Sequence, residues 1–206
     1  MPAVDESDAF DGHGEHLLLH RPATDSRPAR LVATCRLLTP AGARRTGGLQ
    51  AQTLFDLSRL IGLRSRIVEV SHCVIDPAWL GAGLVPVLLS ALTDFMLHND
   101  LDIGLGCVSL TLHDGGHQAA SLWRRLQPGH AASARLAAIP RLPLPINALR
   151  DDPRATPPAL LQGLLRCGAR LLGPPAWHAG AGTAELPMLL QLAYLPAAYR
   201  RHGLAR

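Results

Sequence analysis

The sequence predicts an α/β fold in which helices flank a mixed central sheet. Over residues 66–110, a strand, a glycine-containing turn, an apolar helix and a second strand follow one another, and such a crossover usually joins parallel strands. Two earlier apolar segments, separated by a proline-bounded loop, indicate an antiparallel hairpin. With 206 residues, 48% of them hydrophobic, the chain suits a single domain over 1–206.

The first half of the chain supplies three predicted strands. Residues 15–20 and 30–38 are the strands of the hairpin. Leucines at helical spacing in 53–63 predict a short helix or an ordered loop. Residues 65–75 form the third strand, and Pro77 ends it.

The remaining elements follow from periodicity and from proline and glycine positions. They are a helix over 84–98, a strand over 101–110, a long irregular excursion over 113–157 with a helical piece at 118–126, a helix over 158–172 and a last strand over 188–195.

The cationic residues of the chain are all arginines, because the sequence contains no lysine. This excludes a Schiff-base enzyme and a P-loop. The net charge of +4 and the pI near 9.3 fit anionic partners such as phosphates, an acidic carrier protein or a lipid surface, and a merely solvated surface equally well. We expect the pairs Arg124-Arg125 and Arg200-Arg201 to serve such docking, with no nucleic acid as a partner.

The four cysteines lack metal-binding spacing, and three of them stand within apolar runs. We expect Cys35, Cys73, Cys107 and Cys167 to be reduced core residues, neither disulfide-bonded nor zinc ligands. No signal peptide stands at the N-terminus, and the longest apolar stretch, 84–97, is too short to span a bilayer. These features predict a cytoplasmic protein. The histidines are scattered, so no metal is expected.

The segment that carries chemistry runs from residue 67 to residue 97. A strand delivers Glu69 and His72, and a small-residue turn then opens the long helix. Backbone N–H groups at such a helix start bind anions, although the turn can also serve only close packing. His72 stands three positions beyond Glu69, so the two side chains face opposite sides of the sheet unless a bulge intervenes.

Several segments, in order and over nearly the whole chain, resemble the bacterial ornithine N-acyltransferases, relatives of the acyl-homoserine-lactone synthases and of GNAT acetyltransferases. The matching segments are Asp8-Ala9-Phe10-Asp11, Glu15-His16-Leu17-Leu18, Thr34-Cys35-Arg36-Leu37-Leu38, Leu54-Phe55-Asp56-Leu57-Ser58, Glu69-Val70-Ser71-His72-Cys73-Val74, Gly106-Cys107-Val108-Ser109, Pro157-Pro158-Ala159-Leu160-Leu161, Gly173-Pro174-Pro175-Ala176, Gly182-Thr183-Ala184-Glu185 and Tyr199-Arg200-Arg201-His202.

The resemblance implies a GNAT-like fold and the transfer of a 3-hydroxyacyl group from acyl carrier protein to the α-amine of ornithine. It implies no permanently bound cofactor, because the phosphopantetheine-linked acyl donor is a substrate. Glu69 and His72 are the expected catalytic residues, Glu69 as general base or ammonium anchor and His72 as proton shuttle. Otherwise Glu69 is a carboxylate on a solvated sheet face or paired with an arginine, and His72 is a core histidine. The donor would lie against Cys73, Val74, Ile75, Gly81, Ala82, Gly83 and Leu84. The acceptor would lie against Asp56, Ser58 and Glu185, with a local cap as the other role for Asp56 and Ser58.

The chain also departs from the family pattern. The segment that usually precedes Phe10 is missing. Leu80, Leu164 and His178 replace the family's Arg, Tyr and Asp, and His72 stands where the family has Arg. Two alternatives therefore remain open: an acetyl-CoA-dependent N-acetyltransferase for small molecules, and a shortened, non-catalytic GNAT-like domain.

Overall fold

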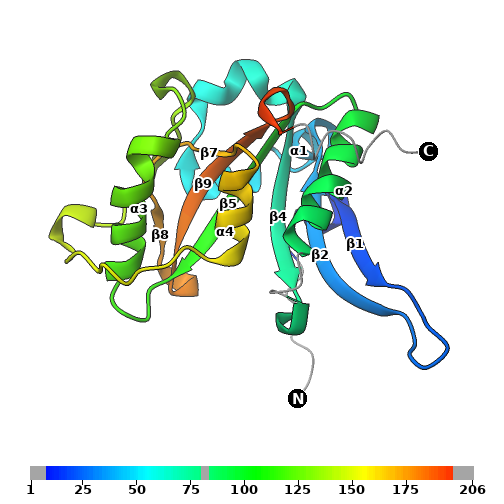
Figure 1. The fold of residues 1–206 in the computed structure, drawn as a ribbon. Coiled ribbons are helices and arrows are strands. Elements are labelled where there is room, and N and C mark those ends of the chain that lie inside the picture. The colour runs from blue at the N-terminus through cyan, green and yellow to red at the C-terminus, as the bar shows by residue number, and fades with distance from the viewer. Residues whose placement is uncertain (1–7, 80–83, 197–206) are drawn as a thin grey trace.

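A mixed β-sheet with helices on its faces forms the molecule, and the computed structural model describes residues 8–79 and 84–196 of the chain (Figure 1). The sheet has seven strands in the order β1-β2-β4-β5-β9-β7, and β8 pairs with β9. The strands are β1 (Glu15–Arg21), β2 (Arg30–Leu38), β4 (Ile67–Ile75), β5 (Ile103–Thr111), β7 (Arg170–Leu171), β8 (Ala176–His178) and β9 (Thr183–Gln191). A separate pair joins β3 (Phe55–Asp56) to β6 (Ile139–Pro140).

The helices connect these strands. The α-helices are α1 (Pro40–Arg45), α2 (Leu84–His98), α3 (His117–His130) and α4 (Ala159–Arg166). The 3-10 helices are η1 (Asp11–His13), η2 (Gln50–Thr53), η3 (Ser58–Arg66), η4 (Pro77–Trp79), η5 (Ala134–Leu136), η6 (Ile146–Ala148), η7 (Ala179–Ala181) and η8 (Leu192–Tyr194). No described helix is long and apolar enough to cross a bilayer.

The strand pairing confirms the mixed sheet. β1 with β2, β2 with β4 and β5 with β9 are antiparallel, whereas β4 and β5, which α2 connects, are parallel. The predicted hairpin and the predicted crossover are therefore both correct, and α2 has the predicted bounds.

The parallel pair separates halfway along its length. β4 pairs with β5 only from Ile67 to Val70, opposite Ile103 to Gly106. Beyond this point β4 remains paired only with β2 and β5 only with β9, and the two strands diverge (Figure 1). The last pair fits because Gly106 has no side chain: a Cβ there would lie 2.7 Å from the carbonyl oxygen of Val70.

Apolar side chains cover both faces of the sheet. α2 and α4 lie on one face (Figure 1), where Leu88, Leu92 and Leu161 belong to a core shared with the strands. On the other face, a second core contains Phe55 of β3, Leu60 of η3, and Leu57, which lies between these two elements. The sheet is thus covered on both faces, as the near-continuous apolar character of β4 and β5 requires.

A β-bulge interrupts β4 at His72. The register between β2 and β4 shifts between Thr34 and Arg36, and His72 has a positive φ of 49°. The bulge inserts one extra residue, so the alternation of side chains reverses beyond it. His72 therefore lies on the same side of the sheet as Glu69, the exception that the sequence analysis allowed for.

The second half of the chain differs from several predictions. The helix predicted over 158–172 ends at Arg166, because Gly168 adopts a φ of 86° that stops the helix and turns the chain into β7. The last strand starts earlier than predicted, at Thr183, and ends at Gln191. Within 113–157, α3 is longer than the predicted piece, and 53–63 contains β3 and part of η3 rather than one element.

The prediction for two of the four cysteines was wrong. Cys35 on β2 and Cys73 on β4 form a disulfide, because antiparallel pairing beside the bulge places the two side chains together. Their separation of 38 residues in sequence gave no sign of this contact. Cys107 and Cys167 form no disulfide.

Two glycines of β5 offer a matched test of the strand separation. Gly106→Ala should lower the free energy of unfolding by about 1–3 kcal/mol, because its methyl group meets a backbone oxygen that cannot move aside. Gly104→Ala is the control: its Cβ would lie 3.7 Å from the nearest atom, so stability should change by less than about 1 kcal/mol. Urea unfolding of both variants measures the difference, and equal losses would contradict this role for Gly106.

Candidate active site

The separation of β4 and β5 opens a cleft of about 500 Å³. Glu69 and His72 reach it from β4, Cys107 and Ser109 from β5, and Glu185 from β9. Residues of η2, α4, β8 and the start of β9 complete its wall: Gln50, Ala51, Leu160, His178 and Thr183 all line it. The cleft therefore collects side chains from segments that are far apart in the sequence.

Glu69 is buried at the inner end of the cleft, with 2% of its surface exposed. One carboxylate oxygen accepts the backbone N–H of Gln50 and the other that of Ala51, both at 2.6 Å. Glu69 is thus neither on a solvated face nor ion-paired with Arg. Burial raises the pKa of this carboxyl, and the two N–H groups and the nearby charge of Arg36 oppose that rise. A raised pKa suits a group that must accept a proton near neutral pH.

His72 stands on the bulge and lines the same cleft. Its side chain is exposed, and it lies close enough to Asp11 to help lower the pKa of that carboxyl. A core histidine, the alternative raised by the sequence, is therefore excluded. An exposed imidazole in the same cleft as a buried carboxylate is a group that can exchange protons with solvent.

Glu185 lines the same cleft from β9, where its register partner on β5 is Ser109. It is 8% exposed, and its carboxylate accepts hydrogen bonds from the hydroxyls of Ser109, at 2.9 Å, and Thr183, at 2.8 Å. Cys107 lies between the two carboxylates: burial first, and then the charges of Glu185 and Glu69, raise the pKa of its thiol. Among the described residues, neither Glu185 nor Glu69 forms an ion pair, so both carboxylates line the cleft without a paired cation.

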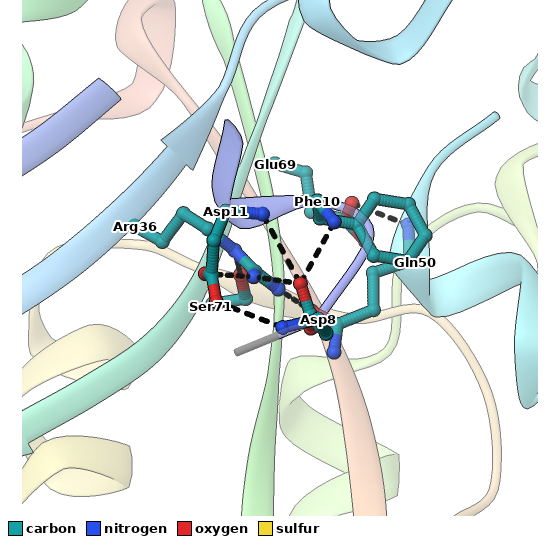
Figure 2. Close-up of polar contacts among 7 residues, drawn as sticks. All are labelled: Asp8, Phe10, Asp11, Arg36, Gln50, Glu69 and Ser71. Carbon is teal, nitrogen blue, oxygen red and sulfur yellow. Dashed lines mark hydrogen bonds and ion pairs between the residues drawn. The ribbon is translucent and has the colours of Figure 1, made fainter. Parts of the chain in front are cut away.

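A buried arginine lies close to Glu69 and binds several of the segments around it (Figure 2). Arg36 on β2 is 2% exposed, and one of its Nη atoms contacts Asp8 and Asp11, each at 2.5 Å. Its other nitrogens donate to Gln50 Oε1 at 2.7 Å and to Ser71 Oγ at 3.1 Å. The guanidinium therefore fastens the N-terminal segment and η2, whose N–H groups hold Glu69, to the sheet.

The charges in this cluster reinforce one another. Burial by itself would raise the pKa of Asp8, but the bonds from Arg36 and from the N–H of Phe10 outweigh it and lower that pKa. The N–H of Asp8 and the guanidinium of Arg36 lower the pKa of Asp11. The ring of Phe10 lies 5.5 Å from the guanidinium carbon of Arg36, close enough for a cation–π interaction.

An apolar cavity of about 60 Å³ opens from the inner end of the cleft, between the sheet and the two helices α2 and α4. Val70, Cys73, Cys107, Val108 and Leu160 line both spaces. The cavity has room for several water-sized groups. Its other walls are Leu17, Cys35, Leu37, Leu88, Leu89, Leu92, Gly104, Leu105, Gly106, Leu164, Ala169, Met188 and Leu190.

The other residues predicted to bind the donor or the acceptor lie in different parts of the structure. Asp56 and Ser58 lie outside the cleft lining, and Asp56 accepts the N–H of Ser58 in a local turn, which also lowers its pKa. Cys73 reaches both the cleft and the apolar cavity. Val74 and Ile75 continue the part of β4 that β5 leaves unpaired, and Leu84 is the first residue of α2. Gly81, Ala82 and Gly83 lie outside the described residues.

The cluster around Arg36 that supports the site was not predicted from the sequence. Asp8, Asp11, Arg36 and Gln50 were not among the predicted site residues. One signal was available: Arg36 interrupts the apolar strand Leu31–Leu38 at an inward position, and a buried arginine requires carboxylate partners. In residues 8–79 and 84–196, no group of three or more His, Cys, Asp and Glu side chains has a metal-binding arrangement.

The Arg36 cluster predicts an acid-dependent loss of stability. Lowered pKa values for Asp8 and Asp11 mean that their stabilisation is complete above the ordinary Asp pKa near 3.8 and is lost as the pH falls through the lowered values. The double variant Asp8→Asn/Asp11→Asn should therefore have a melting temperature well below that of wild type at pH 7, and this difference in melting temperature should disappear at acidic pH.

Thermal unfolding between pH 2 and pH 7 measures that difference. Asp25→Asn/Asp100→Asn is the matched control, because it removes the same charge from two exposed carboxylates. A difference that is independent of pH, or one that the control reproduces, would contradict the role given to the cluster.

Comparison with proteins of known sequence reveals one curated relative. Over 107 residues the chain is 30% identical to the L-ornithine N(alpha)-acyltransferase of Rhodobacter capsulatus, a match covering 50% of this chain and 40% of that protein. The chain therefore matches less than half the length of this relative.

Two solved structures are similar to the chain at 14% identity. One is the CoA-dependent acyl-homoserine lactone synthase MesI, with a TM-score of 0.47, covering 100% of this chain and 77% of that one. The other is the CoA-dependent acyl-homoserine lactone synthase BjaI with SAM and isopentyl-CoA, with a TM-score of 0.43, covering 98% and 70%.

The family profile of the acetyltransferase (GNAT) domain matches residues 2–89, which include β1, β2, the bulged strand β4 and the start of α2. The observed sheet continues this arrangement through β5 to β9. Residues 2–89 thus resemble the GNAT acetyltransferase domain, and the described chain has a mixed α/β sheet.

Proposed function

We propose that this protein is an N-acyltransferase that moves an acyl group from a phosphopantetheine-linked donor to the amine of an amino acid with a cationic side chain, with ornithine as the preferred acceptor. One observation carries the proposal. A cleft with two buried carboxylates, Glu69 and Glu185, meets an apolar cavity at the point where β4 and β5 separate.

The donor would occupy the space between the strands. Beyond Val70 and Gly106, the facing edges of β4 and β5 no longer pair with each other, so their backbone groups are available to the amides of a pantetheine arm. The acyl chain would enter the apolar cavity, and the thioester carbonyl would then lie at the junction of the two spaces.

The acceptor would bind on the polar side of that junction. Its α-amine would approach Glu69, and a second ammonium group on its side chain would approach Glu185. A buried carboxylate that forms only hydrogen bonds to hydroxyls, as Glu185 does with Ser109 and Thr183, gains strongly from a cationic partner. A diamino acid therefore suits the two carboxylates better than a neutral amino acid does.

The reaction would be a direct attack. The neutral amine forms the C–N bond at the thioester carbonyl, and the C–S bond then breaks to release the thiol. Glu69 takes the proton of the attacking amine, and His72, on the solvent side, can pass it on. The raised pKa of Glu69 favours this proton acceptance.

The two alternatives predict different donors or no turnover. Transfer of an acetyl group would leave the apolar cavity empty. A long acyl chain would need the leucine side chains around the cavity to move, because the cavity has a volume of only about 60 Å³. A non-catalytic domain would give no product. Acyl carrier protein, as the source of a long 3-hydroxyacyl group, is the donor that we propose, and acyl-CoA is compared with it.

The acceptor preference tests the proposal. With long 3-hydroxyacyl donors, ornithine should give N-acyl product at a kcat/KM at least about 100-fold above that for norvaline, which lacks only the terminal amine, because its ammonium pairs with Glu185. Glu185→Gln should lower the ornithine value by about 10–100-fold and leave norvaline unchanged. Mass spectrometry of the products, with acetyl-CoA as a parallel donor, measures both. Equal rates for the two acceptors would contradict the role of Glu185.

The role of Glu69 is tested by turnover per folded molecule. Glu69→Gln should reduce kcat by roughly 10²–10⁴-fold, and the loss should shrink as pH rises and more of the amine is already neutral. Because the amide can accept only one of the two N–H groups, stability should also fall, by about 1–3 kcal/mol.

Circular dichroism gives the folded fraction by which each rate is divided. His72→Gln is the control within the same cleft, and its loss should be much smaller. If turnover per folded molecule is unchanged in Glu69→Gln, Glu69 only holds η2 in place.

A further inference from the structure

Three arginines and one isoleucine form a second surface near the N-terminal end of β4. The first turn of α2 follows the other end of this strand. Arg44, Ile61 and Arg64 line a depression of about 490 Å³ between α1 and η3. Arg44 and Arg45 also line the adjoining depression, beside Ser65. We call Arg44, Arg45, Arg64 and Ile61 the α1–η3 surface.

The charges of this surface are uncompensated. Within the described parts of the chain, none of the three guanidiniums forms an ion pair or a hydrogen bond. Neighbouring Arg66, by contrast, is paired with Asp102. One carboxylate, Glu15, lines the adjoining depression, which leaves three exposed positive charges against one negative charge.

An apolar side chain stands among these charges. Ile61 is 62% exposed, although the residue before it, Leu60, is fully buried and anchors η3 in the second core. A single exposed isoleucine is ordinary on a protein surface. Next to three unpaired arginines it matches a partner that offers both anionic groups and an apolar phase.

We propose that the α1–η3 surface binds the face of a membrane that contains anionic phospholipids. The guanidiniums would pair with lipid phosphates, each contributing about fivefold to the affinity, and Ile61 would enter the acyl boundary. Reversible peripheral binding of this kind combines an electrostatic and an apolar contribution.

An acidic carrier protein fits this position less well. The donor is expected near the start of α2, which follows the far end of β4. The nine residues of β4 span about 30 Å, so a carrier bound at the α1–η3 surface would present its arm at the wrong end of the strand. Two arginine pairs were expected to dock such a carrier. Arg200-Arg201 lies outside the described residues, and the other pair is engaged elsewhere: Arg124 binds the carbonyl oxygens of Ile146 and Leu149, and Arg125 that of Ala155.

The surface adjoins the candidate active site through η2. Gly48, Leu49 and Gln52 line its depression, whereas Gln50 and Ala51 line the cleft and hold Glu69. A membrane at this surface would receive an acylated product close to where it forms. The binding itself does not depend on the proposed acyl transfer.

Vesicle co-sedimentation of the full chain, without substrates, tests the inference. Wild type should bind vesicles of equal parts phosphatidylglycerol and phosphatidylcholine, and should bind vesicles of pure phosphatidylcholine far more weakly. High salt should dissociate the protein from the vesicles that contain phosphatidylglycerol. Arg44→Ser/Arg45→Ser/Arg64→Ser should weaken binding by about 100-fold, and Ile61→Ser by about tenfold.

The control removes three other exposed arginines, in Arg135→Ser/Arg150→Ser/Arg154→Ser, and should retain nearly all of the binding. Equal losses in the two triple variants, an unaffected Ile61→Ser, or no binding by wild type would overturn the inference. So would a surface variant that loses affinity for acyl carrier protein while it retains vesicle binding. Acyl transfer is assayed separately in solution, so its failure would leave these results interpretable.

Discussion

The structure depends on one constraint: β4 and β5 pair for four residues and then separate. Gly106 permits the close approach at the last pair, and each strand beyond it remains fixed by its outer neighbour, β2 or β9. Both the polar cleft and the apolar cavity result from that separation. A continuous ladder would fill the space with backbone hydrogen bonds and leave no site.

The cleft keeps its charge because the protein binds its carboxylates with neutral donors. Glu69 accepts two backbone N–H groups and Glu185 two hydroxyls. The buried cation nearby, Arg36, is instead committed to Asp8 and Asp11. The guanidinium of Arg36 therefore has a structural role, and the carboxylates of Glu69 and Glu185 remain without a paired cation.

The two ends of β4 have different environments. Toward its C-terminal end the strand is bulged at His72 and unpaired on one side. Before its first residue lie Arg64 and the exposed Ile61, with Arg44 and Arg45 of α1 nearby. Between these two environments, η2 and the residues before it border both the cleft and the α1–η3 surface.

Sequence alone determined the α/β class, the hairpin, the crossover through α2 and the presence of a carboxylate within an apolar strand, because hydrophobic periodicity and glycine or proline positions are local properties. Tertiary structure decided the rest. The bulge brings His72 to the side of Glu69. The register of β5 with β9 places Glu185 beside Ser109 in the same cleft, and β2–β4 pairing joins Cys35 to Cys73. Such contacts depend on strand register and on a single inserted residue, and a one-residue change in register moves every later side chain to the other face.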